Sequence, residues 1–145
     1  DLPTFRLPKI AGGRNLQIKG RITPRSNHGV IFAHGDHING YAIYMRQGLL
    51  CFATCVNGER EVVVSTAPIT QTVDFEANWN NKGVMLLKIN KILVSKPKMV
   101  QLLSVEPTES IQIGGDAGQQ VGDYKSSKGF SGIIENLTFK YPIGS

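Results

Sequence analysis

The sequence is poor in the residues from which most catalytic and redox sites are built. It has two cysteines, three histidines and one tryptophan among 145 residues. No Ser, His and Asp set lies in a strand–elbow–helix context, and no Walker-type phosphate loop is present. No close pair of carboxylates indicates glycoside hydrolysis. These absences argue against an enzyme that acts by itself.

Long apolar stretches are also missing. No run approaches the roughly 20 apolar residues that cross a bilayer, and the chain begins at Asp1 without the regions of a signal peptide. We expect a soluble domain with no membrane partner. At 145 residues and 41% hydrophobic, residues 1–145 have the size of one domain, which we expect to be excised from a larger exported protein.

Cys51 and Cys55 lie four residues apart in one predicted strand. At a rise of about 3.3 Å per residue, they are roughly 13 Å apart on the same face of the strand. A disulfide does not span that distance. We expect two small, buried, apolar side chains, which leave the redox compartment undecided.

The net charge is +5, which favours anionic partners such as nucleic acid, an anionic membrane or a sulfated glycan. The sixteen Lys and Arg are scattered from Arg6 to Lys140 with no run of three. A nucleic-acid surface would have to assemble in three dimensions, so we expect no nucleic-acid partner.

Tight turns and alternating segments are abundant. Leu16, Ile18 and Ile22 alternate with polar residues, which predicts a half-buried strand. Asn57-Gly58 lies between two β-rich runs and predicts a type I′ hairpin, and Asn90-Lys91 predicts a second one.

The whole chain reads as ten or more short strands without a credible helix. This pattern predicts an all-β protein, a two-sheet antiparallel β-sandwich or jelly roll, with a barrel as the alternative. In the last strand, Ile133, Leu137 and Phe139 are expected to point inward. The predicted strands span residues 15–22, 29–35, 41–46, 49–56, 61–65, 72–79, 85–89, 92–94, 99–105, 110–113 and 130–141.

Three segments resemble the opening of laminin G-like, concanavalin A-like sandwich domains: Gly29-Val-Ile-Phe-Ala-His-Gly, Asn39-Gly-Tyr-Ala-Ile-Tyr and Gly48-Leu-Leu-Cys-Phe-Ala. Two others are similar to the C-terminal domain of bacterial arylsulfatases, namely Pro8-Lys-Ile-Ala-Gly and the Gly-rich segment 114–124 followed by 130–134. This second resemblance implies a secreted or periplasmic, non-catalytic accessory domain. It implies as partner the sulfatase-like catalytic domain of the same parent chain.

An independent carbohydrate-binding, lectin-like module is the alternative hypothesis. Trp79 lies beside Asn78 and Asn80, and an aromatic face next to amide groups is what sugar rings stack on and bond to. The competing interpretation is a strand-end tryptophan that covers the sandwich edge. Protein–protein adhesion, a third hypothesis, rests on the laminin G-like resemblance alone.

A second set of carbohydrate-binding candidates lies on one predicted strand. Tyr41, Tyr44 and Arg46 would line a concave sheet face, where the guanidinium pairs with a sulfate or carboxylate. The competing interpretation is ordinary sheet packing.

Calcium is the one cofactor that the sequence leaves open. Asp36, Asp116 and Asp123 lie in Gly-rich loops of the kind that wrap hard oxygen ligands around this ion, although Asp and Gly are also ordinary turn residues. His28, His34 and His37 lie with Asp36 within ten residues, but their spacing is not specific for zinc. His34 closes a strand and His37 belongs to a turn, and we expect solvated loop residues.

Overall fold

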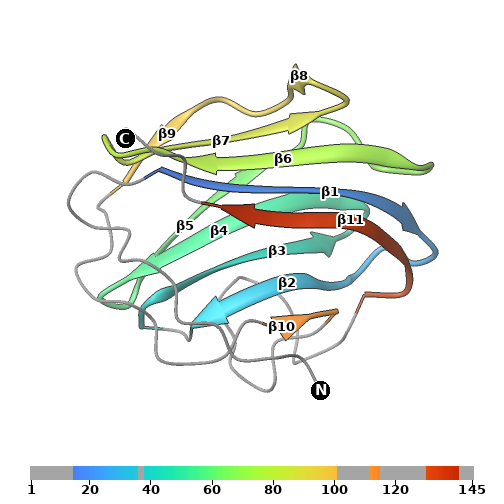
Figure 1. Ribbon diagram of the computed structural model, residues 1–145, viewed down its shortest axis with the longest axis horizontal. Helices are drawn as coiled ribbons and strands as arrows, with labels where there is room; N and C mark the ends of the chain where they lie inside the picture. The colour runs from blue at the N-terminus through green and yellow to red at the C-terminus, as the bar shows by residue number, and fades with distance from the viewer. Residues whose placement is uncertain (1–14, 36–37, 101–111, 115–129, 141–145) are drawn as a thin grey trace.

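The computed structural model describes residues 15–35, 38–100, 112–114 and 130–140. Within these ranges the chain forms eleven strands and no helix. The strands make two antiparallel sheets that pack face to face (Figure 1). The predicted all-β sandwich is therefore confirmed. None of the described residues belongs to a helix long and apolar enough to span a membrane.

One sheet has six strands and the other has five. The six-stranded sheet has the order β11-β1-β6-β7-β8, and β9 also pairs with β7. Its strands are β11 (Gly132–Lys140), β1 (Leu16–Pro24), β6 (Val73–Trp79), β7 (Val84–Ile89), β8 (Ile92–Leu93) and β9 (Lys98–Met99). The five-stranded sheet has the order β10-β2-β3-β4-β5; its strands are β10 (Gln112–Ile113), β2 (Gly29–Gly35), β3 (Gly40–Arg46), β4 (Leu49–Val56) and β5 (Glu59–Val64).

The two sheets are buried to different extents. In β2, β3 and β4 almost every residue is buried, so both faces of the five-stranded sheet are covered there. In β1 and β6 buried residues alternate with half-buried or exposed ones. Strands covered on both faces have continuous apolar sequences, and strands with one wet face alternate. The outer face of the six-stranded sheet is the one that meets solvent.

An aromatic cluster fills one end of the space between the sheets. The ring of Tyr41 meets Trp79 edge-on at 6.4 Å between centroids and stacks on Phe139 at 6.0 Å. The hydroxyl of Tyr41 lies 2.7 Å from Nδ1 of His34, which is buried. The prediction that His34 is a solvated loop residue is wrong, because it is the last inward position of β2 and pairs with Tyr41 across the sheet.

Both predicted hairpins are present. Asn57 and Gly58 have φ of 51° and 81°, and Asn90 and Lys91 have φ of 50° and 70°. Positive φ at both central positions is the requirement of a type I′ turn. Cys51 and Cys55 are buried on β4 and form no disulfide with each other, as predicted.

The predicted inward face of the last strand is only half right. Leu137 and Phe139 pack against the core, but Ile133 is 42% exposed and Ile134 packs inward in its place. The register with β1 shifts between Lys19 and Arg21, and Asn136 has φ of 55°. A β-bulge inserts one extra residue and reverses the alternation on its far side.

The later strands were predicted longer than their described parts. β9 ends at Met99, and residues 101–111 lie outside the described residues, so the predictions over 99–105 and 110–113 are confirmed only at β9 and β10. That residues 1–145 are one domain of a larger protein stays a prediction.

Candidate functional site

The predicted aromatic surface for sugars is not on the surface. Trp79 and Tyr41 have no exposed area and Tyr44 is 1% exposed. Trp79 is in register with Leu16 and Met85, and these are inward positions of the six-stranded sheet. This corrects the carbohydrate-stacking hypothesis for these rings, because Trp79 and Tyr41 point into the space between the sheets and Tyr44 is buried on the covered outer face of the five-stranded sheet.

The polar members of the predicted site are spread over three places. Asn78 lies on the outer face of β6, and Arg46 is exposed at the end of β3. Asn80 is a turn residue, because its Oδ1 accepts hydrogen bonds from the backbone N–H groups of Lys82 at 2.9 Å and Val84 at 3.0 Å. The fold therefore does not bring the six predicted carbohydrate-binding residues together.

The predicted calcium ligands Asp36, Asp116 and Asp123 lie outside the described residues. In the part of the chain that the structure describes, no group of three or more His, Cys, Asp or Glu side chains is placed to hold a metal ion. The calcium hypothesis stays a prediction.

Glu76 is the centre of a hydrogen-bonded group on the outer face of the six-stranded sheet. Its Oε2 accepts from the side-chain amides of Asn78 at 2.9 Å and Gln17 at 3.1 Å. Its other oxygen lies 3.8 Å from Nζ of Lys19. Partial burial opposes ionisation, but the Asn78 hydrogen bond and the charges of Lys19 and Lys88 outweigh it and hold the pKa of Glu76 below its ordinary value.

Arg21 and Asp74 form a second pair on the same face. Nε of Arg21 donates to the carboxylate at 2.8 Å. This hydrogen bond, with the charge of the guanidinium, lowers the pKa of Asp74. The acids on this part of the face are therefore ionised near neutral pH and compensated by their own neighbours, so it offers little net charge to a ligand.

The net charge lies elsewhere, at the edge of this sheet. Residues 77–105 contain five lysines and no Asp, Glu or Arg. The other eleven Lys and Arg are balanced by eleven Asp and Glu, so the whole net charge of +5 resides in this segment. We define the basic edge by its lysines: Lys82, Lys88, Lys91, Lys96 and Lys98.

The strands place these lysines along one border of the sandwich. Lys88 is in β7 and Lys98 in β9, which both lie at the edge that Figure 1 shows at the top. Lys82, Lys91 and Lys96 are in the turns before and after these strands, are exposed, and make no ion pair with any residue of the described ranges. Lys82 and Lys96 thus carry positive charges that no acid of the described ranges neutralises, whereas the charge of Lys91 helps to lower the pKa of Asp74.

Local turn chemistry holds the basic edge in place. Gly83 has φ of 85°, and a Cβ there would collide with the carbonyl oxygen of Val100. The absence of a side chain lets the backbone N–H of Val100 donate to the Gly83 carbonyl at 2.7 Å. This bond fastens the end of β9 beside β7.

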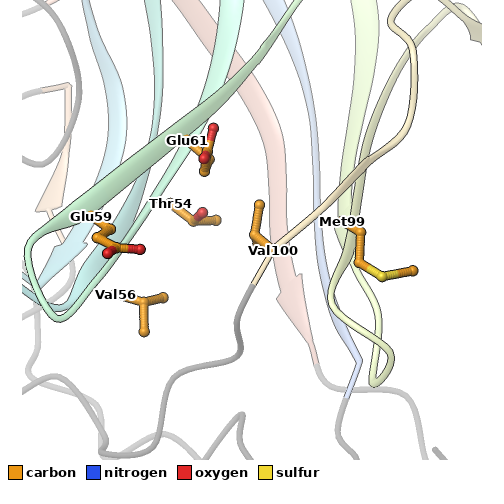
Figure 2. A pocket seen from close by; sticks show the side chains of 6 residues that line it. All are labelled: Thr54, Val56, Glu59, Glu61, Met99 and Val100. Atoms are coloured by element: carbon orange, nitrogen blue, oxygen red, sulfur yellow. The ribbon is translucent and has the colours of Figure 1, made fainter.

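A pocket of about 220 Å³ marks the inner limit of the basic edge. Figure 2 shows Glu59, Glu61 and Thr54 on the β4–β5 side and Val100 across from them. Nζ of Lys98 lies 2.9 Å from a carboxylate oxygen of Glu61 and bridges the two sheets. Glu61 is therefore compensated by Lys98, which leaves Glu59 as the carboxylate that repels an anion at this pocket.

Sequence reasoning missed the basic edge because it looked for consecutive basic residues. The detectable signal was the absence of acidic residues over 29 positions that hold five lysines. In a hairpin with a following edge strand, residues spread over such a length lie along one border. Charge asymmetry over a whole segment was therefore the informative quantity.

No family model matches the sequence, and no curated protein matches it. Solved structures do resemble it. Domains LG4-5 of the mouse laminin α1 chain superpose with a TM-score of 0.70 at 17% identity, over 94% of this chain and 39% of that one. A heptameric SAP-like pentraxin from Limulus polyphemus gives 0.62 at 18%, over 94% and 72%.

A third structure, from botulinum neurotoxin type C, gives a TM-score of 0.62 at 16% identity over 87% of this chain and 32% of that one. That protein is reported to need two ganglioside molecules to enter cells. At these identities the likeness establishes the fold, a laminin G-like, concanavalin A-like jelly roll, as the sequence predicted. This chain spans less than half of the laminin and neurotoxin chains.

The resemblance to arylsulfatase C-terminal domains finds no support in these comparisons. None of the three structures is a sulfatase, and no family model identifies one. Most of the segments that carry the resemblance, residues 8–12 and 115–124, lie outside the described residues.

Proposed function

We propose that this chain is a non-catalytic recognition module that binds an anionic glycan along its basic edge. The observation that carries the proposal is the charge distribution, since the entire net charge of +5 lies in residues 77–105. Lys82, Lys91 and Lys96 are exposed there without an ion pair in the described ranges.

Lysine chemistry fits a sulfated or carboxylated glycan. An ammonium is a compact charge on a flexible stem, so a row of lysines follows a chain of anions without fixed geometry. A surface of one charge sign also raises the local concentration of the ligand and speeds association. The fold adds support, because the neurotoxin that shares it depends on gangliosides, which are acidic glycolipids.

The test is affinity for a heparin column with a salt gradient. The triple variant Lys82→Gln, Lys91→Gln, Lys96→Gln should elute at clearly lower salt, with an affinity for the soluble glycan reduced roughly tenfold, about 1.4 kcal/mol. Retention of the wild type and of the variants should fall as ionic strength rises, because salt screens exposed charges.

The matched control removes three exposed positive charges elsewhere: Lys19→Gln, Arg25→Gln, Arg60→Gln. It should retain most of the binding. Equal losses in the two triple variants would show a response to net charge only, and no retention of the wild-type protein at low salt would reject the proposal. Arg46→Gln is tested as a separate variant, because the sequence predicted that Arg46 contacts sulfate.

The accessory role in a sulfatase-like hydrolase, and with it a secreted or periplasmic location, is our second candidate. The segments 8–12 and 114–134 favour it. A parent gene without an upstream catalytic sulfatase motif would remove it. A glycan-binding edge is compatible with either context, since an accessory domain can hold the polymer that a catalytic domain degrades.

A further inference from the structure

Apolar side chains are exposed within the basic edge. Ile92 is 67% exposed, Leu93 48% and Met99 73%. They account for half of the large hydrophobic side chains that are exposed in the described ranges, and the others lie on separate elements. Ile92 and Leu93 are neighbours in β8 and pair with the last residues of β7, whereas Met99 in β9 pairs with Val84 at the other end of β7. We refer to Ile92 and Leu93 as the apolar ridge. Neighbouring exposed apolar groups mark a contact surface.

The apolar ridge lies directly beside the tip of a hairpin. Ile92 and Leu93 follow the Asn90-Lys91 turn directly and form β8, which projects at the end of β7 (Figure 1). Ile92 pairs with Ile89 and Leu93 with Lys88, so the two side chains leave opposite faces of the hairpin. The hairpin end is therefore apolar on both sides.

A free glycan explains the lysines but not these apolar side chains. A flat protein surface would cover only one face of the hairpin. A fluid bilayer interface surrounds both faces of a hairpin that enters it. It also combines the two components seen here, apolar side chains that enter the acyl boundary and lysines that meet anionic headgroups.

We propose that the apolar ridge docks this domain on an anionic lipid bilayer, with Ile92 and Leu93 inserted and the basic edge on the headgroups. This inference rests on the proposed function in that the same lysines bind the anionic groups. It departs from our sequence-based expectation of no membrane partner, which rested on the lack of apolar segments long enough to span a bilayer.

The first experiment is cosedimentation with phosphatidylcholine vesicles with and without about 30 mol% phosphatidylserine, which supplies the anionic headgroups. The wild-type protein should bind only the anionic vesicles. The variant Ile92→Ser, Leu93→Ser should bind them about tenfold more weakly. The matched control Ile38→Ser, Ile133→Ser changes two exposed isoleucines outside the ridge and should bind like wild type.

The second experiment measures insertion. The variant Leu93→Trp should show a blue-shifted emission and quenching by brominated acyl chains on anionic vesicles. The wild-type protein is the control, because its single Trp79 is fully buried and stays unquenched. Absence of quenching, or equal vesicle binding by the wild type and Ile92→Ser, Leu93→Ser, overturns the inference.

The two proposals fail in distinguishable ways. The Ile92→Ser, Leu93→Ser variant should keep its affinity for soluble heparin, whereas the triple lysine variant should lose both heparin and vesicles. Heparin binding without binding to anionic vesicles rejects the membrane inference alone. Vesicle binding without heparin binding rejects the glycan proposal and leaves the membrane inference standing.

Discussion

The outer faces of the two sheets differ in burial. On the five-stranded sheet the outward residues Ala42, Cys51 and Ala53 are as buried as the inner core. On the six-stranded sheet the outward residues Lys19 and Arg21 are exposed and ion-paired. A sheet covered on both faces presents few of its own side chains to solvent, so the solvent-facing side chains of the sandwich lie mainly on the open sheet and its edge.

The difference between the faces has a simple cause. Small and apolar outward residues gain free energy from burial, about 25 cal/mol per Å² of apolar surface. Outward Glu, Lys and Arg remain in water because burying a charge costs several kcal/mol. The composition of the outward positions therefore decides which face is covered.

The largest expected effect comes from placing one carboxylate on each outer face. Ala42→Asp buries a charge at a position with no exposed area and should destabilise the protein by about 3–5 kcal/mol. Thr138→Asp lies exposed opposite Lys19 and should change stability by less than about 0.5 kcal/mol. Urea unfolding measures both, and similar losses would refute the contrast between the faces.

An intermediate effect on stability is expected from alanine substitutions of one turn glycine in each sheet. Gly58 in the β4–β5 turn and Gly83 before β7 have φ of 81° and 85°, but only Gly83 has an atom close to its missing Cβ. Gly58→Ala should cost about 1–2 kcal/mol for the left-handed backbone. Gly83→Ala should cost about 1–3 kcal/mol more, because it displaces Val100. Thermal unfolding of the two variants gives the difference, and equal costs would mean that β9 is not fastened as described.

The smallest expected effect concerns the charges of the open face. Glu76 has a lowered pKa in the folded protein, so it contributes stability above the ordinary value of about 4.5 and loses it as the pH falls through the folded value. In Glu76→Gln the loss of unfolding free energy between neutral and acid pH should be smaller than in the wild type, by less than about 1 kcal/mol. Unfolding measured between pH 2 and pH 7 tests this, and the same loss in both proteins would contradict the role of Glu76.

Local patterns predicted the elements well where turn chemistry is strong. Asn57-Gly58 and Asn90-Lys91 define hairpins because few residues adopt positive φ. Ile133 was misplaced because a bulge at Asn136 depends on pairing with β1, which a single strand does not reveal. Trp79 was misplaced for a related reason, since its strand alternation allows either face and only packing against Tyr41 selects the inner one.

The sequence by itself determined the strands, the hairpins, the sandwich class and the burial of Cys51 and Cys55, because these follow from a period of two and from turn residues. The tertiary structure alone decided that Trp79, Tyr41 and Tyr44 are buried and that the lysines of residues 82–98 share one edge with exposed Ile92 and Leu93. Side chains distant in sequence become one surface only when strand order and register bring them together, and neither is encoded in local periodicity.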